Sequence, residues 1–241
     1  MAPQYNLAVF GMTDKHLPPL DMERLVERTS RAADYINNFW TSVFRDRVDV
    51  SVFSTAIQTN SYPGHPHYGK AAHREFEEGL DGQYPGMPEG WWPTAYHNIG
   101  GHGPDGIAGQ ASGIRSVTYL GGSNTMHLHE TGHNNPPQLD SQLPHNSKVK
   151  NGKMDEYGGN SMMGMVAVTP SPYEYYRLGM IPEHRVEDCT ATNDVHFLVS
   201  AGLEEAACLP DEKQLLKITV TDEDQDPHLK DGEYYLGLSQ F

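Results

Sequence analysis

The segment His129-Glu130-Thr131-Gly132-His133 constrains this chain most, because its spacing has chemical meaning only on a helix. Residues four positions apart lie on one helical face, so the two imidazoles can bind one metal ion together. Glu130 lies about 100° further round the helix, where its carboxylate reaches a water molecule beside the ion rather than the ion itself. The segment Asn134-Asn135-Pro136-Pro137 then predicts that the helix ends just after His133. The pattern predicts a zinc hydrolase site, with a Lewis acid, an acidified water and a general base.

The third metal ligand has to come from the chain that follows the helix. A catalytic zinc ion has three protein ligands and one open position, whereas a structural zinc ion has four protein ligands. Asp140 and His145 are both candidates, and no fourth ligand is obvious, which favours a catalytic ion. Cys189 and Cys208 form no C-x-x-C pair, so a zinc site built from cysteines is not expected, and a disulfide or two thiols are equally open.

The order of predicted elements indicates an α/β (α+β) fold. An apolar run at residues 5–10 predicts a first strand that ends at Gly11, and alternation at residues 48–53 predicts a second. Between them, Asp21 is placed to cap a helix that runs to about Phe44. The apolar stripe expected along this helix comprises Leu25, Ala32, Tyr35, Ile36, Phe39, Trp40 and Val43. Residues 113–120 predict a further strand, and Ser123 can cap the helix that carries the histidines. Strand, helix and strand in this order favour a mostly parallel sheet.

Bulk properties exclude some partners. The formal charge of −15 argues against nucleic acid or an anionic membrane surface, because both require a basic footprint. No apolar run is long enough to span a membrane, and the first residues lack a basic segment followed by an apolar run, so neither a transmembrane helix nor a signal peptide is expected. Residues 60–106 are rich in Pro, Gly and aromatic residues and also hold His65, His67, His73, His97 and His102. Such a stretch is more typical of a surface loop than of a second metal site.

Two short motifs together resemble the metzincin metallopeptidases. The first is His129-Glu130-Thr131-Gly132-His133-Asn134, and the second runs from Glu156-Tyr157-Gly158 to Met162-Met163-Gly164. Within that clan the chain looks most like the gametolysin family of secreted proteases that degrade cell walls and matrix. The resemblance implies that Met163, with Met162 as the alternate, forms the "Met-turn" that packs under the zinc ligands. The segment after it, residues 171–181, is similar to the helix that follows this turn in the family, and residues 216–220 and 233–236 are similar to its later strand pair.

The spacing after His133 departs from the metzincin pattern. That pattern places a glycine and a ligand at the positions that Pro136 and Leu139 occupy here. An insertion of six residues brings residues 142–147 into line with the family's Gly-Leu-x-His-Ser. By this resemblance His145 is the third zinc ligand, with Asp140 as the alternative.

The resemblance implies a zinc-dependent endopeptidase, secreted to the outside of the cell, in which Glu130 is the general base. It implies a metzincin-like fold with a twisted, mostly parallel sheet and an active-site helix in an N-terminal catalytic subdomain, residues 1–134. A smaller C-terminal subdomain, residues 135–241, would supply the third ligand, the Met-turn and the terminal strands. A protein or peptide substrate would lie along the cleft, with residues 113–120 as the candidate edge for pairing with it.

Other hypotheses stay open. The chain could be a weak or inactive metzincin-like protein that binds zinc and acts as a binding module, or a zinc hydrolase of non-protein amides. His127 is expected to be a surface or outer-shell residue, and the tyrosines near the motifs are expected to serve packing. Residues 222–233 match part of a calcium-binding loop, with Asp222, Asp224, Asp226 and Glu233 as candidate Ca²⁺ ligands. Pro227 occupies the position that requires glycine, so at most weak calcium binding is expected.

Overall fold

The structure is a computed structural model of the chain, and it divides into two compact units, Met1–Gln142 and Leu143–Phe241. The described residues are 2–13, 18–58, 95–98, 109–112, 115–118, 124–134, 143–145, 148–150, 153–155, 161–164, 169–189, 198–201, 208–220 and 232–238. The subdomain boundary that the sequence predicts after residue 134 adjoins residues 135–142, which lie outside this set. Each unit is therefore described by itself.

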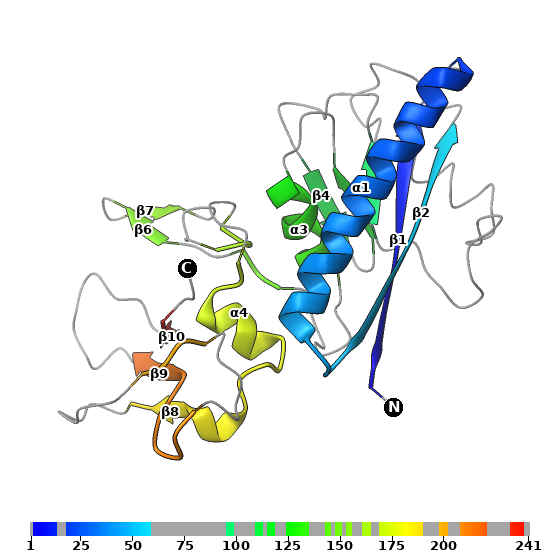
Figure 1. The fold of residues 1–241 in the computed structure, drawn as a ribbon. Helices are drawn as coiled ribbons and strands as arrows, with labels where there is room; N and C mark the ends of the chain where they lie inside the picture. Colours follow the sequence, from blue (N-terminus) through cyan, green and yellow to red (C-terminus); the bar gives the residue numbers. More distant parts are fainter. Residues whose placement is uncertain are drawn as a thin grey trace. The chain divides into compact units, whose positions relative to one another are not determined.

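The first unit is built on a five-stranded sheet (Figure 1). Its strands are β1 (Gln4–Thr13), β2 (Asp49–Gln58), β3 (Ala95–Asn98), β4 (Gly109–Ser112) and β5 (Arg115–Thr118), in the order β2-β1-β3-β5-β4. The first four in this order pair in parallel, and β4 pairs antiparallel with β5. Among the described strands, β4 thus forms an edge of the sheet. The predicted α/β (α+β) fold class, with a mostly parallel sheet in this unit, is therefore confirmed.

Helix α1 (Pro19–Phe44) supplies much of the core of this unit. Leu25, Ile36 and Trp40 of the predicted stripe are buried, whereas Tyr35 and Phe39 are only half-buried. The helix begins after Pro18, which offers no side-chain cap, so the prediction that Asp21 is the cap is wrong. Proline suits this position because its fixed φ is compatible with the start of a helix. Asp21 instead lies in the first turn, where a carboxylate is favourable beside the unpaired N–H groups.

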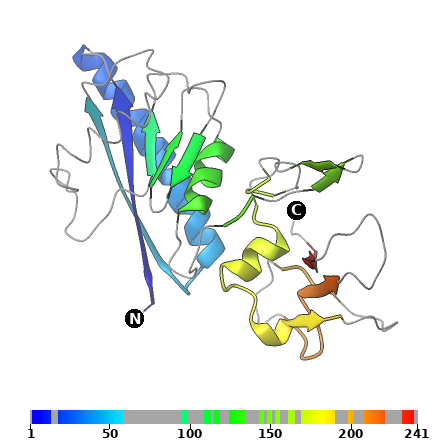
Figure 2. The ribbon, with the colours of Figure 1, turned by 180° about the vertical axis from the view of Figure 1, so that it is seen from behind.

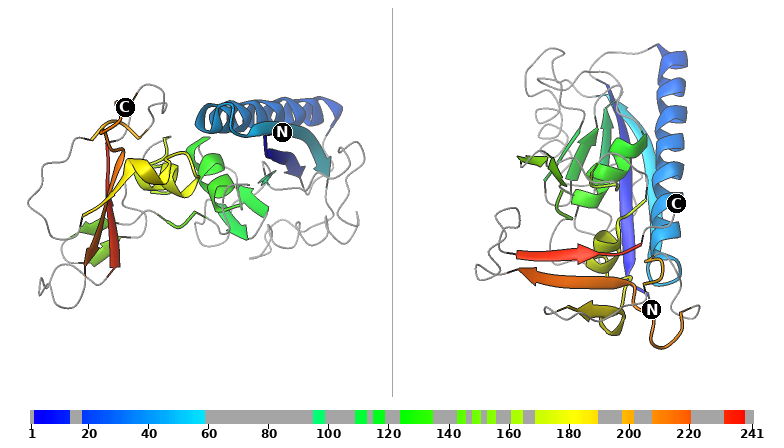
Figure 3. Two further views of the ribbon diagram at one scale, coloured as in Figure 1. Left: turned by 90° about the horizontal axis from the view of Figure 1, so that it is seen from below. Right: turned by 90° about the vertical axis from the view of Figure 1, so that its left-hand side faces the viewer.

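Helices α1 and α3 (Asn124–His133) lie on the same face of the five-stranded sheet, with α3 over β4 and β5 (Figures 2 and 3). The fully buried rings of Trp40 and Phe44 stack with centroids 5.3 Å apart, and Tyr5 of β1 meets both edge-on. Burial of each such side chain stabilises the folded state by about 1.5–3 kcal/mol. The core therefore fixes α1 against the sheet and provides a surface for α3.

The second unit combines short helices with two small sheets. A three-stranded sheet has the order β10-β9-β8, formed by β8 (Val186–Asp188), β9 (Leu215–Val220) and β10 (Gly232–Leu236). The antiparallel pairing of β9 with β10 confirms the predicted terminal strand pair. Helix α4 (Pro172–Arg177) packs on these two strands, the 3₁₀ turn η2 (Glu183–Arg185) leads into β8, and β6 (Lys148–Lys150) pairs with β7 (Lys153–Asp155). A small core of Ile181, Ala201 and Leu215 lies beneath them.

Two expectations about strand positions need correction. Gly11 lies inside β1 and does not end it, because the strand continues to Thr13. The segment expected to be a free edge, residues 113–120, contains β5 (Arg115–Thr118), which lies between β3 and β4. The edge next to β5 is β4, a strand of only four residues that shows no apolar alternation in the sequence, and β2 forms the opposite edge of the described sheet. No described helix is both long enough and apolar enough to cross a membrane.

Candidate metal centre

Helix α3 carries the candidate site and ends at His133, as predicted. Met126 and Leu128 are buried and fix the helix to the core, while the same helix also buries His129 and Glu130. Burial of polar groups costs free energy unless they find partners, so a helix with this composition needs a compensating interaction. The predicted cap Ser123 lies outside the described residues.

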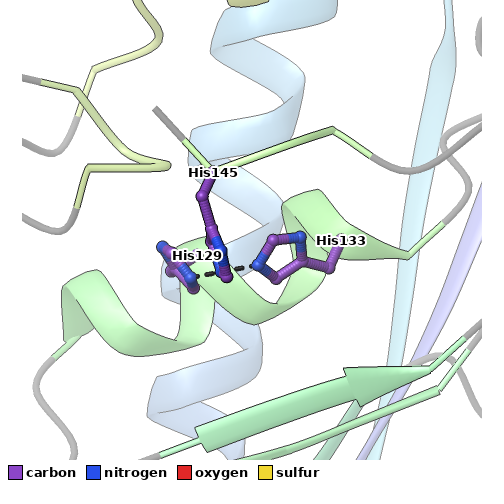
Figure 4. A group of neighbouring side chains, drawn as sticks. All are labelled: His129, His133 and His145. Atoms are coloured by element: carbon purple, nitrogen blue, oxygen red, sulfur yellow. Dashed lines mark hydrogen bonds between the residues drawn. The ribbon is translucent and has the colours of Figure 1, made fainter. Parts of the chain in front are cut away.

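Three imidazoles gather at this helix. Ligand atoms of His129, His133 and His145 all lie within 4.8 Å of one another, and Figure 4 shows the three rings pointing together. The Nε2 atoms of His129 and His133 are 3.1 Å apart, and their rings stand at 86° to each other. Two nitrogens bound to a tetrahedral zinc ion at about 2.0–2.1 Å are separated by roughly 3.3 Å. The pair therefore has nearly the spacing of two zinc ligands.

His145 joins the other two histidines from a separate segment (Figure 4). It follows the buried Leu143 and the exposed Pro144 and is itself half-buried. The proximity of this third imidazole is thus observed, while its role as a zinc ligand stays a prediction. The alternative ligand, Asp140, lies outside the described residues.

Glu130 is the most unusual group near the histidines. Its side chain is only 4% exposed, and its Oε2 atom is buried without a hydrogen-bond partner among the described residues. Burial raises the pKa of Glu130 to about 8, because the charged form loses its hydration. An unsatisfied buried carboxylate oxygen is costly, and in native proteins it commonly marks a functional group or an unseen partner. Here it lies beside a group of potential metal ligands.

The surface position expected for His127 is wrong, while its alternative, an outer-shell role, stays a prediction. It is 5% exposed, and burial lowers its pKa to about 4, so its imidazole is neutral at pH 7. It does not belong to the group of three histidines. A buried neutral imidazole here contributes to the packing of α3, and the spacing of two residues from His129 already predicts a different side of the helix.

The end of α3 is tied to strands β1 and β5 of the sheet through hydrogen bonds that the sequence did not predict. The Tyr5 hydroxyl donates to the Thr131 carbonyl oxygen at 3.2 Å, and Asn134 Nδ2 donates to Ser116 Oγ of β5 at 3.2 Å. Both contacts join residues far apart in the sequence, so no local pattern could reveal them. They hold the helix turn that contains His133 in place.

The predicted Met-turn corresponds to a tight turn at Ser161–Gly164 in the second unit. Met162 and Met163 are fully buried. Glu174 Oε1 accepts hydrogen bonds from Ser161 Oγ at 2.8 Å and from the Met163 N–H at 3.1 Å. The packing of Met163 under the metal ligands stays a prediction.

Glu174 was missed by the sequence analysis, although its signal is visible there. Ser171-Pro-Tyr-Glu174 fits the capping-box pattern, and both reciprocal hydrogen bonds are present. Burial raises the pKa of Glu174, and the hydrogen bonds from Ser171, Ser161 and Met163 act in the opposite direction. One carboxylate therefore caps α4 and also holds the methionine turn.

Several other predicted residues do not gather at the histidines or lie outside the described part of the chain. The rings of Tyr173 and Tyr176 pack against Tyr235, and Tyr175 packs on the small core of the second unit, in agreement with a packing role. Cys189 and Cys208 are not joined in a disulfide. His65, His67, His73, His102, Glu156, Tyr157 and the candidate calcium ligands Asp222, Asp224 and Asp226 lie outside the described residues.

Comparison with known proteins assigns no family to this chain. No family model and no curated protein sequence matches it. Among solved structures, one described as the structure of a chaperone-substrate complex is similar, with a TM-score of 0.45 and 10% sequence identity. The match covers 74% of this chain and 34% of that chain. The chain thus spans about a third of the length of that structure.

Proposed function

We propose that this chain is a zinc-dependent endopeptidase of the metzincin type, with His129, His133 and His145 as zinc ligands. The observation that carries the proposal is the buried Oε2 atom of Glu130, which has no described hydrogen-bond partner and lies one residue from a ligand. This buried oxygen atom needs a hydrogen-bond donor. A water molecule bound beside the imidazoles would supply one. A metzincin fold and secretion from the cell are parts of the same proposal.

The donor set suits zinc. Imidazole nitrogen is a preferred zinc ligand, and three histidines with an open position form the ligand set of a catalytic ion rather than a structural one. A bound zinc ion would polarise the scissile carbonyl group and lower the pKa of a water molecule. Imidazole binds zinc through an unprotonated ring nitrogen, so zinc affinity should fall as the pH is lowered.

Glu130 then performs the proton transfers. A divalent cation held by the three imidazoles would favour the ionised form of this carboxyl group, which is the form that can act as a base. Oε2 accepts a proton from the attacking water, and Glu130 passes that proton to the leaving amine when the peptide bond breaks. Because the carboxylate is buried, bulk water has little access to it and does not remove that proton before the amine receives it.

Strand β4 is the element proposed to bind the peptide. It is one of the two edge strands of the described sheet, and Gly109 at its start lies against the Glu130 side chain. An extended peptide can add to a free strand edge through backbone hydrogen bonds. This proposal replaces residues 113–120 as the pairing edge.

The experiment is a casein or gelatin digestion assay with the purified chain, with and without a zinc chelator. We expect hydrolysis that chelator abolishes and added zinc restores. Glu130→Ala should keep one zinc ion but lose about 10²-fold or more of the rate, while Glu23→Ala, which removes an exposed carboxylate of α1, should have no effect.

The outcomes separate the alternatives. A chain that binds zinc but digests no protein would be the binding module or the hydrolase of non-protein amides, and mass spectrometry of cell-wall digests would distinguish these two. Full activity of Glu130→Ala would refute the mechanism.

A further inference from the structure

We infer that Gly109 is a positioning residue for the Glu130 carboxylate, an inference that deepens the proposed function and names a role for the edge strand. Gly109 begins β4, and its backbone passes directly beside the Glu130 side chain. A Cβ atom at residue 109 would lie 2.7 Å from Glu130 Cγ and 2.8 Å from Cδ, and closer still to Oε1. Real Cβ atoms essentially never approach other heavy atoms so closely.

The three atoms nearest to that position all belong to Glu130. Because Cγ and Cδ are included, rotation of the carboxylate alone cannot relieve the contact, and the whole side chain has to move. Glu130 is buried at 4% exposure, so neighbouring atoms restrict where it can go. A methyl group at residue 109 would therefore displace the carboxylate from its present position.

The effect of such a methyl group is steric and not conformational. The backbone of Gly109 does not lie in the left-handed region, since Gly179 is the described glycine with positive φ. Alanine can thus adopt the same backbone conformation without strain. The absence of a side chain at Gly109 serves the close approach between strand and helix.

The face of β4 that meets α3 consists of small residues. Side chains alternate along a strand, so Ala111 lies on the same face as Gly109. In the antiparallel register, Gly109 is opposite Thr118 and Ala111 is opposite Ser116. Ser116 contacts Asn134 at the end of α3, which confirms that this face looks toward the helix. The size of the residue at position 109 therefore determines how closely the Glu130 side chain can approach β4.

The first test is a double-mutant cycle of thermal unfolding in four proteins: the parent, Gly109→Ala, Glu130→Ala and the double variant. In the parent background, Gly109→Ala should lower the Tm by roughly 2–12 °C, because overpacking costs about 1–3 kcal/mol and each kcal/mol shifts the Tm by about 2–4 °C in a chain of this size. In the Glu130→Ala background the same change should lower the Tm by less than about 2 °C, because the atoms that it would strike are gone. Equal losses in both backgrounds would overturn the inference.

The second test is kinetic and uses the zinc-loaded protein. A carboxylate misplaced by about 1 Å can cost about 10²-fold in rate, so kcat of Gly109→Ala should fall by that order with little change in KM or in zinc content. Gly11→Ala is the matched control, since its added Cβ would strike Thr29 and Leu25 instead. It should lower the Tm while leaving kcat near that of the parent.

The two tests distinguish an error in the proposed function from an error in the positioning role of Gly109. If the parent hydrolyses no peptide, the proposed function is wrong, and the unfolding cycle still decides whether Gly109 sets the position of Glu130. If the parent is active and Gly109→Ala keeps kcat within about twofold of the parent value, the positioning role is wrong even though the proposed function stands.

Discussion

The indole N–H of Trp40 donates a hydrogen bond of 3.0 Å to Thr131 Oγ1, which links α1 to the spacer between Glu130 and His133. Thr131 Oγ1 in turn donates to the Leu128 carbonyl oxygen at 3.0 Å. Both side chains are buried, so the bond is shielded from water. The residue that follows Glu130 and precedes the second candidate ligand is thus fixed by the core.

Trp40→Phe should lower the free energy of unfolding by about 1–3 kcal/mol, because it removes the donor and leaves Thr131 with one partner fewer. The ring stacking with Phe44 should persist. Trp40→Ala is the comparison variant and should cost about 3–5 kcal/mol, since it also empties a core position. Urea unfolding monitored by circular dichroism measures both changes. A loss near zero in Trp40→Phe, together with a full loss in Trp40→Ala, would mean that the hydrogen bond contributes nothing separate from packing.

His145→Ala should weaken zinc binding by at least about 100-fold, more than the loss of an outer-shell partner commonly costs. Without His145, the proposed three-ligand site retains only His129 and His133, both on α3. His184→Ala serves as the control, because it removes an exposed imidazole in the turn before β8. Competition with a chromogenic chelator gives both affinities. Unchanged affinity in His145→Ala, together with a loss in Asp140→Ala, would identify Asp140 as the third ligand.

Glu174→Gln should change how stability depends on pH. Burial holds the pKa of the Glu174 carboxyl group above its ordinary value of 4.5, so above pH 4.5 the folded state binds more protons at this residue than the unfolded state. This group's contribution to stability is therefore largest below pH 4.5 and declines as the pH rises above that value. Glutamine does not titrate, so the parent should lose stability relative to Glu174→Gln between pH 4.5 and 7. Urea unfolding at several pH values gives the difference, and a constant difference or the opposite slope would contradict the assignment.

The sequence predicted those elements whose signal is local. The apolar stripe of Leu25, Ile36 and Trp40 predicted α1, and the histidine spacing followed by two prolines predicted α3 and its end. The alternation around residue 50 predicted β2, which pairs in parallel with β1. In each case the period of the pattern matches the period of the element.

The parts that the sequence missed depend on contacts between distant segments. The four residues of β4 are small or polar, so nothing in them indicates an edge strand, and Gly109 gains its meaning only beside Glu130. The bond between Trp40 and Thr131 joins residues 91 positions apart. Glu174 is the intermediate case, because its capping box is readable and its contact with Met163 is not.

The most direct test of the proposed metal centre is an anomalous difference map at the zinc absorption edge from crystals of the zinc-loaded chain. One peak should lie about 2.0–2.1 Å from a ring nitrogen of each of His129, His133 and His145, with an open position on the side of Glu130. A zinc peak held by other residues, or three separated imidazoles in a zinc-saturated crystal, would contradict the proposal.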